Sequence, residues 1–135
     1  MFTPYIHFKG HCREAMETYQ RIFGGELTIS TYGDMPDMAS PEMGLDRVMH
    51  SGLMSPEAGN LMASDFPANF EGDDQKAMSV SVELKSAERA EEIYEALKTE
   101  DGVIMPFGPT FFSPGMGMTK DRFGTHWIIT TTPAA

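Results

Sequence analysis

Four residues of this chain carry side chains that bind metals or move protons: His7, His50, Asp65 and His126. Each lies in a segment predicted to be a β-strand. Two or three histidines with one carboxylate form a ligand set that suits zinc, iron or manganese. The same set can act as general acid and base. The alternative interpretation is that each histidine is an ordinary, partly buried side chain with a hydrogen-bond partner.

The strands that carry these residues alternate with two predicted helices. Residues 11–23 and 87–98 each place their apolar side chains on one stripe at helical period. Gly24 and Gly25 end the first helix, and Ser86 caps the second. Alternation of polar and apolar residues predicts strands over 2–8, 26–32, 47–54, 60–65, 77–84, 103–112, 115–120 and 125–131.

Each half of the chain therefore has the order strand, helix, strand, strand, strand. We predict an α+β fold of two tandem βαβββ modules, residues 1–66 and 75–135, joined by a linker over 67–74 into one compact structural domain. A helix packs on one face of each sheet, and the other face is free to curve into a cup. The alternative is a ferredoxin-like α+β domain.

Several stretches carry a family resemblance. They are PYIHFKGHCREAMETYQRIFGGEL, DRVMHSGL, LMASD and the ending MTKDRFGTHWII. Their order and spacing are similar to PhnB-like proteins of the vicinal-oxygen-chelate superfamily, the glyoxalase, bleomycin-resistance and dioxygenase group. The resemblance implies a glyoxalase-like fold, in which paired βαβββ modules form a curved, mostly antiparallel cup. It also implies a homodimer.

In metal-using relatives, four ligands come from the first and fourth strands of each module. The resemblance places these positions at Thr3, Ala63, Ala77 and Ile128. None of these residues is a good ligand, so we expect no metal at the superfamily's usual positions. A displaced site for one divalent ion stays open. His7, Asp65 and His126 each lie two residues from such a position on the same predicted face, and His50 can join them.

Strand alternation also suggests residues for the walls of a pocket. Tyr5, Ser79 and Ser81 should face the cup, while Phe107 and Phe111 could line its rim. The alternative for the two phenylalanines is plain core packing. The side chains of the twelve methionines could fill gaps in the core or form an adaptable pocket wall.

Composition excludes several classes of partner. A formal charge of −10 over 135 residues repels phosphate backbones, which argues against a nucleic-acid partner. No apolar run reaches the roughly 20 residues needed to cross a bilayer, so we expect no membrane partner. The opening MFTPYIHFKG lacks the pattern of a signal peptide, and we expect a cytoplasmic protein. The single cysteine, Cys12, allows no intramolecular disulfide.

Two functions fit these observations. One is an enzyme with lyase, isomerase or oxygenase-like activity on a small molecule, using a displaced metal or a metal-free acid–base site. The other is a metal-independent protein that binds and sequesters a small molecule, as bleomycin-resistance relatives do. A third, weaker interpretation is a structural dimer without a ligand. The methyltransferase label that this family has carried finds no support, because GMGMT at 115–119 precedes a strand and no helix.

Overall fold

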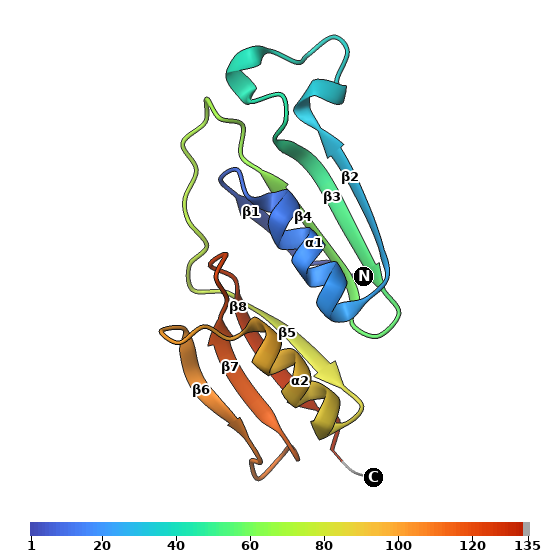
Figure 1. Ribbon diagram of the computed structural model, residues 1–135, viewed down its shortest axis with the longest axis vertical. Coiled ribbons are helices and arrows are strands. Elements are labelled where there is room, and N and C mark those ends of the chain that lie inside the picture. The colour runs from blue at the N-terminus through green and yellow to red at the C-terminus, as the bar shows by residue number, and fades with distance from the viewer. Residues whose placement is uncertain (134–135) are drawn as a thin grey trace. The chain divides into compact units, whose positions relative to one another are not determined.

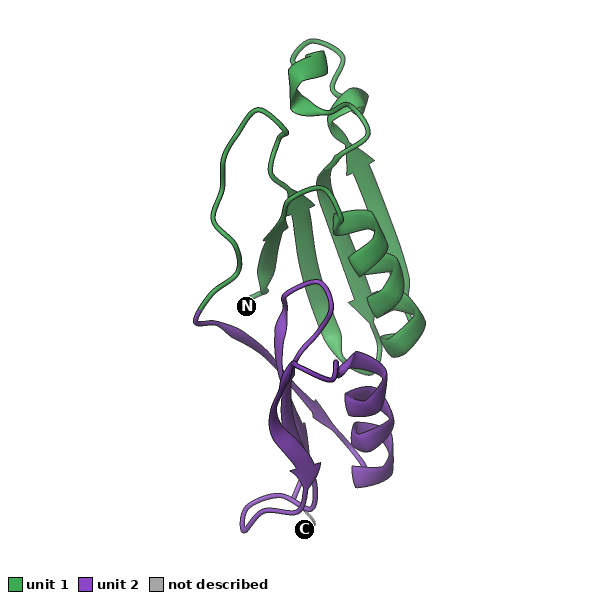
Figure 2. Ribbon diagram, turned by 60° about the vertical axis from the view of Figure 1, so that its left-hand side comes forward, with its two compact units in different colours: residues 1–76 green, residues 77–135 purple. Residues whose placement is uncertain are grey.

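The computed structural model describes residues 1–133, and the chain divides into two compact units (Figure 2). The first unit comprises residues 1–76, and the second begins at Ala77. Segment 67–74, expected as a linker, therefore belongs to the first unit. Each unit contains one helix and one four-stranded mixed sheet, which confirms the α+β class with two βαβββ modules. No helix in the described residues is both long enough and apolar enough to cross a bilayer.

The first unit builds its sheet in the order β1-β4-β3-β2 (Figure 1). β1 pairs with β4 in parallel, and the other two pairs are antiparallel. Two 3-10 turns lie in the connection between β2 and β3. The bounds are β1 Tyr5–Phe8, α1 Cys12–Phe23, β2 Glu26–Thr31, η1 Tyr32–Asp34, η2 Pro41–Met43, β3 Val48–Ser55 and β4 Gly59–Asp65.

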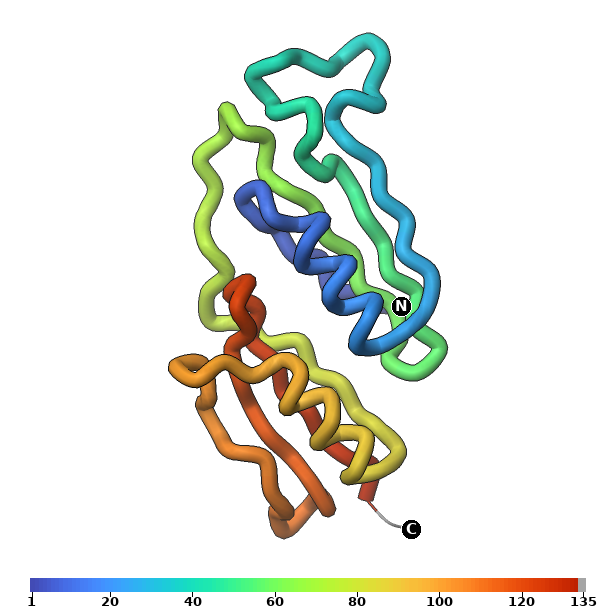
Figure 3. The backbone as a smooth tube through the Cα atoms, in the orientation of Figure 1, coloured from blue at the N-terminus to red at the C-terminus, as the bar shows by residue number. Residues whose placement is uncertain are grey.

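The second unit repeats this plan with the sheet order β5-β8-β7-β6. β5 pairs with β8 in parallel, and the remaining pairs are antiparallel. Each unit has one helix and four strands, and the backbone tube of Figure 3 follows the chain through the two units in turn. The bounds are β5 Ser79–Leu84, α2 Ala87–Leu97, β6 Val103–Gly108, β7 Met116–Lys120 and β8 His126–Thr131.

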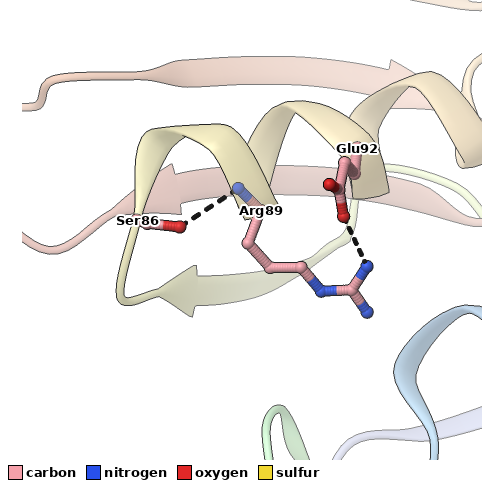
Figure 4. Close-up of polar contacts among 3 residues, drawn as sticks. All are labelled: Ser86, Arg89 and Glu92. Carbon is pink, nitrogen blue, oxygen red and sulfur yellow. Dashed lines mark hydrogen bonds and ion pairs between the residues drawn. The ribbon is translucent and has the colours of Figure 1, made fainter.

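Both helices begin and end as the sequence predicts. The side-chain hydroxyl of Ser86 accepts a hydrogen bond from the main-chain N–H of Arg89 at 3.1 Å, which caps α2 (Figure 4). One turn later the Arg89 guanidinium pairs with Glu92 at 3.1 Å. Gly24 ends α1 with a φ of 74°, a conformation that costs glycine little.

Each helix covers one face of its own sheet and buries the core there. In the first unit this core includes Ile6, Phe8, Met16, Tyr19 and Leu53; in the second it includes Val82, Leu84, Ile93, Trp127 and Ile129. The opposite face of each sheet, called the open face below, carries no helix of its own unit. Side chains on the open face are therefore free to meet a ligand or a partner.

Strand register decides which side chains lie on the open face, because paired residues point to the same side of a sheet. Along β1, Ile6 and Phe8 are buried under α1, and Tyr5 and His7 alternate with them on the open face. Since His7 pairs with Ser64, that serine shares the open face.

Asp65 corrects the sequence-based prediction, because it pairs with Phe8 and so lies on the helix face. Its Oδ1 accepts the main-chain N–H groups of Gly10 at 2.8 Å and Cys12 at 3.0 Å. Its Oδ2 accepts the N–H of Val48 at 2.9 Å. Only 2% of the residue is exposed. The same one-residue shift places Ala63 on the helix face, opposite Ile6.

We predict that Asp65→Asn lowers the free energy of unfolding by about 2 to 3 kcal/mol. The amide group removes one acceptor and turns an N–H₂ group towards backbone donors, so at least one buried N–H loses its partner. Urea unfolding measures the change, and Asp73→Asn, an exposed aspartate of the same unit, is the control. Equal stability of the two variants would show that the buried carboxylate contributes little.

Candidate functional site

The open face of the first sheet gathers a group of polar and aromatic side chains, called the histidine cluster here: Tyr5, His7, His50, Ser64 and Phe66. The Tyr5 hydroxyl lies 2.9 Å from Nδ1 of His50. The Ser64 hydroxyl lies 3.2 Å from Nδ1 of His7. The Tyr5 ring centroid is 5.1 Å from that of His7 and 5.6 Å from that of His50. The structure therefore brings together two of the four predicted site residues and one predicted wall residue.

Both hydrogen bonds use the Nδ1 atom of the imidazole. A hydroxyl beside Nδ1 orients the ring and influences which nitrogen carries the proton. Nε2 of each ring has no hydrogen-bond partner within residues 1–133, and both side chains are exposed. His7 and His50 thus each offer one free ring nitrogen that can donate to or accept from a ligand.

Aromatic stacking continues from this cluster along segment 66–72. The Phe66 ring stacks on His7, with centroids 5.0 Å apart and planes 12° apart, and Phe70 lies 5.5 Å from Phe66. Gly72 comes so close to the Phe66 ring that an added Cβ would lie 2.2 Å from it. Ala68 ties the segment to the preceding loop, because its N–H donates to the Met43 carbonyl at 2.8 Å.

An open groove of about 350 Å³ lies beside this segment. Its lining includes Lys9, Arg47, Phe66, Asn69, Phe70 and Glu71. Arg47 is half-buried, and its Nη1 donates to the Phe66 carbonyl at 3.0 Å. We call this feature the Arg47 groove.

His126, Ser79 and Ser81 lie on the open face of the second sheet. His126 pairs with Ser79 and with Lys120, and Ser81 pairs with Ile128. Nδ1 of His126 is buried and has no hydrogen-bond partner within residues 1–133. His126 belongs to a different unit from the histidine cluster, and the residues paired with it on the neighbouring strands are Ser79 and Lys120.

Phe107 and Phe111 occupy different environments. The Phe107 ring lies 5.7 Å from Tyr94 of α2 and would meet a Cβ added at Gly115, so it packs towards the helix face. Of the two alternatives that the sequence left for Phe107, a rim on the open side or core packing, this placement agrees with core packing. Phe111 is 100% exposed and contacts Phe112 edge to face, with centroids 5.0 Å apart, in the loop before β7.

The displaced metal site does not fit the geometry of the first unit. Asp65 faces α1, away from His7, and both its oxygens accept backbone hydrogen bonds. Within each unit, over the described residues, no three His, Cys, Asp or Glu side chains are close enough to hold a metal ion. Thr3 precedes β1 and Ala77 precedes β5, so neither lies in a strand.

Cys12 is buried at the start of α1 and is no candidate nucleophile. Its Sγ lies 3.6 Å from the Ser51 hydroxyl, which in turn donates to the Ala63 carbonyl at 2.7 Å. Burial raises the pKa of the Cys12 thiol from 9.0 to about 12, so the reactive thiolate is absent at neutral pH. Burial, and then the Asp65 carboxylate, also raise the pKa of Tyr32, whose hydroxyl donates to the Asp65 carbonyl at 2.7 Å.

Residues 1–130 match the model of the family described as 3-demethylubiquinone-9 3-methyltransferase. The chain belongs to this family. A crystal structure of protein PA1353 from Pseudomonas aeruginosa is 36% identical, covers 98% of this chain and 97% of its own, and superposes with a TM-score of 0.86. A Bacillus cereus structure described as a putative 3-demethylubiquinone-9 3-methyltransferase, PhnB protein, is 27% identical with a TM-score of 0.75, covering 97% and 98%.

Two further likenesses extend this assignment. Protein YjdN of Escherichia coli strain K12 is 24% identical over 94% of this chain and 92% of its own. A glyoxylase/bleomycin resistance protein/dioxygenase domain from Frankia sp. EAN1pec is 9% identical with a TM-score of 0.66 over 98% and 97%, which shows a shared fold alone. This PhnB-like chain therefore has the glyoxalase-like fold that the sequence predicts.

Sequence reasoning did not identify Arg47, Lys9 or Phe66 as parts of a site. Lys9 follows β1 and Phe66 follows β4, outside any predicted strand. Arg47 was included in the predicted strand 47–54 but precedes β3 in the structure, so the strand period does not give its position. One signal was available in the sequence. Gly10 and Gly44, close in sequence to two basic residues of an acidic chain, indicate places where the backbone makes room for a large side chain.

We predict that Tyr5→Phe alters the ring-nitrogen chemical shifts of His50 and leaves those of His7 almost unchanged. The substitution keeps the ring and removes the hydroxyl beside His50 Nδ1. Stability should fall by less than about 1 kcal/mol, because the pair is exposed to water. Long-range nitrogen–proton NMR spectra of the histidine rings give the measurement. Unchanged His50 shifts would mean that the hydrogen bond is not formed in solution.

We predict that part of the pH dependence of unfolding above pH 9.0 comes from Cys12. The unfolded thiol ionises at a lower pH than the buried one, so the native state binds more protons there. Stability is then complete below the unfolded pKa and falls as pH rises towards about 12. Cys12→Ala should give a shallower fall in urea unfolding, and Lys85→Gln, an exposed substitution, serves as control. Identical pH profiles for parent and Cys12→Ala would contradict this.

Proposed function

We propose that this PhnB-like protein binds a small planar molecule on the open face of its first sheet and exchanges a proton with it, without a divalent metal. The observation that carries the proposal is the pair of hydroxyl–imidazole contacts, Tyr5 with His50 and His7 with Ser64. Each contact orients one imidazole ring and leaves its Nε2 available. Imidazole is the side chain best suited to proton exchange near neutral pH.

Aromatic surface supports the choice of a planar ligand. Tyr5 and Phe66 each lie within stacking distance of His7, and rings prefer to pack against other planar groups. Phe70 extends this surface and is 58% exposed, so a ligand could bury apolar area there. The open groove of about 350 Å³ that Phe66 and Phe70 line is of a size that suits a small molecule.

The placement of Asp65 supports metal-free chemistry. A carboxylate near the two histidines would give the mixed ligand set that divalent ions prefer. Asp65 instead faces α1 and accepts hydrogen bonds from Gly10, Cys12 and Val48. The histidine cluster then offers imidazole and hydroxyl groups, which suit acid–base contacts and hydrogen bonding.

Methyl transfer, the activity in the family's description, is not part of the proposal. A nucleotide-type methyl donor is usually held by a Gly-rich turn between a parallel strand and a helix. In this chain the turn from β1 to α1 holds one glycine, Gly10, and the turn from β5 to α2 holds Lys85 and Ser86. Neither turn fits that group.

We predict that p-nitrophenol, a planar phenol whose visible absorbance reports its protonation, binds saturably to the purified protein. His7→Ala and His50→Ala should each weaken binding about tenfold by removing one polar contact. His11→Gln, at the start of α1, is the matched control. Absorbance titration gives the affinity, and EDTA should change neither the affinity nor the melting temperature.

Different failures of this experiment have different meanings. Loss of binding or of thermal stability on EDTA treatment would overturn metal independence. Equal binding by the parent and both alanine variants would remove the histidine cluster as the site. Product analysis after incubation separates an enzyme from a protein that only sequesters its ligand. The homodimer predicted from the sequence stays a prediction.

A further inference from the structure

The Arg47 groove presents positive charge in a chain whose formal charge is −10. Arg47 and Lys9 both line it, together with the aromatic rings of Phe66 and Phe70. Basic side chains beside stacked rings in an otherwise acidic protein indicate a place where an anionic, partly apolar molecule is favoured. The groove lies entirely within the first unit and shares Phe66 with the histidine cluster.

Arg47 is held in position from three sides. A Cβ added at Gly10 would lie 3.2 Å from Nη2, and one added at Gly44 would lie 3.1 Å from Cδ. Both glycines have positive φ, 114° and 76°. Nη1 donates to the Phe66 carbonyl at 3.0 Å. Residues other than glycine rarely adopt such φ values. Because glycine has no Cβ, the backbone at these two positions leaves room for the Arg47 side chain.

Most of the hydrogen-bonding capacity of Arg47 is unused. A guanidinium carries five N–H donors in a planar fork, and within residues 1–133 only the Phe66 carbonyl accepts from it. No carboxylate of the described chain lies within ion-pair distance of it. A half-buried guanidinium in this state matches the bidentate geometry of a carboxylate or phosphate group.

We infer that the Arg47 groove binds the oxyanion group of a small aromatic ligand. Arg47 and Lys9 bind the anion, and Phe66 and Phe70 pack against the ring. Because Phe66 also stacks on His7, the ligand's polar substituents can reach the histidine cluster. The inference names the ligand class for that open face and so rests on the proposed function.

Two acidic residues, Asp74 and Glu71, would repel an anion in the Arg47 groove, but neither charge is strong enough at its exposed position to prevent binding. Lys9 pairs with Asp74 at 3.1 Å, but the Asp74 side chain is 88% exposed and that of Lys9 44%. Exposed pairs of this kind contribute little and exchange readily with other anions. Glu71 also lines the groove and is exposed, so water screens its charge more than that of half-buried Arg47.

Three probes separate the contributions to binding: phenyl phosphate, inorganic phosphate and phenol. We expect phenyl phosphate to bind about tenfold more tightly than either fragment, because it alone meets both the cations and the rings. Chemical-shift titration of the full chain gives the affinities and shows which backbone N–H groups respond. Added salt should weaken the binding of phenyl phosphate and leave the binding of phenol almost unaffected.

Variants then show which side chains bind the phosphate group. Arg47→Gln should weaken the binding of phenyl phosphate about ten- to hundredfold. Arg47→Lys should restore part of the loss, since lysine keeps the positive charge but lacks the planar guanidinium group. Arg13→Gln, an exposed arginine of the same unit, is the matched control. Because Arg47→Gln also removes the bond to Phe66, Lys9→Gln offers a second test in an exposed residue, with Lys85→Gln as its control. Glu71→Gln should strengthen binding.

The outcomes distinguish this inference from the proposed function. If phenyl phosphate binds no better than phenol, or if Arg47→Gln and Lys9→Gln leave its affinity unchanged, the anion site is overturned, while p-nitrophenol binding still decides the histidine cluster. If Glu71→Gln weakens binding, the groove prefers cations and the inference is wrong. If Arg47→Gln weakens phenyl phosphate but leaves p-nitrophenol unchanged, both proposals are supported.

Discussion

The buried carboxylate of Asp65 connects the end of β4 with two other parts of the first unit, the start of α1 and the start of β3. Its two oxygens accept N–H groups from the loop after β1, from the first residue of α1 and from the first residue of β3. Charge-assisted hydrogen bonds of this kind are stronger than neutral ones, and burial strengthens them further. By holding β4 beside β1 in one register, Asp65 also places Ser64 opposite His7 on the open face. In the second unit Thr131 occupies the corresponding position opposite Leu84, and its hydroxyl is buried without a partner in the described chain. The buried carboxylate of that unit, Asp121, lies in the turn before β8 and accepts from Phe123, Thr125 and Trp127.

The sequence predicted the fold well because the fold depends on periodic patterns. The two amphipathic helices and the eight strands all appear, most of them close to their expected bounds; β1 begins three residues later and β6 ends four residues earlier than expected. The register of β4 was predicted wrongly, and Asp65 and Ala63 with it. A strand of alternating side chains places every residue on the wrong face when its start is miscounted by one. The residue count from Gly59 did not reveal this error. Four of the last five residues of β4 are buried, so buried and exposed residues do not alternate clearly along the strand.

The candidate site divides into a part that the sequence could indicate and a part that it could not. Tyr5, His7 and His50 lie in strands, so the two-residue period assigns them to the open face. Arg47, Phe66 and Phe70 lie in connections, where backbone geometry has no period and depends on local contacts such as the two glycines around Arg47. Chemical type alone suggested Asp65 as a metal ligand, but its role follows from the backbone N–H groups around it. A carboxylate at the end of a strand can serve a binding site or the fold, and only its neighbours distinguish the two.

The parallel pairing of β1 with β4 has a consequence for the order in which the chain folds during synthesis. Gly10 and Asp65, which hydrogen-bond to each other, are 55 residues apart in sequence. β1 is synthesised before the rest of its unit, so it has no partner until β4, the last strand of that unit, has emerged from the ribosome. Until then Ile6 and Phe8 remain apolar side chains on an unpaired strand, and such exposed strands associate readily with others. The antiparallel strands β2, β3 and β4 are joined by a short turn and the β2–β3 loop, so they can pair before β1 does. β1 can then pair with the free edge of β4.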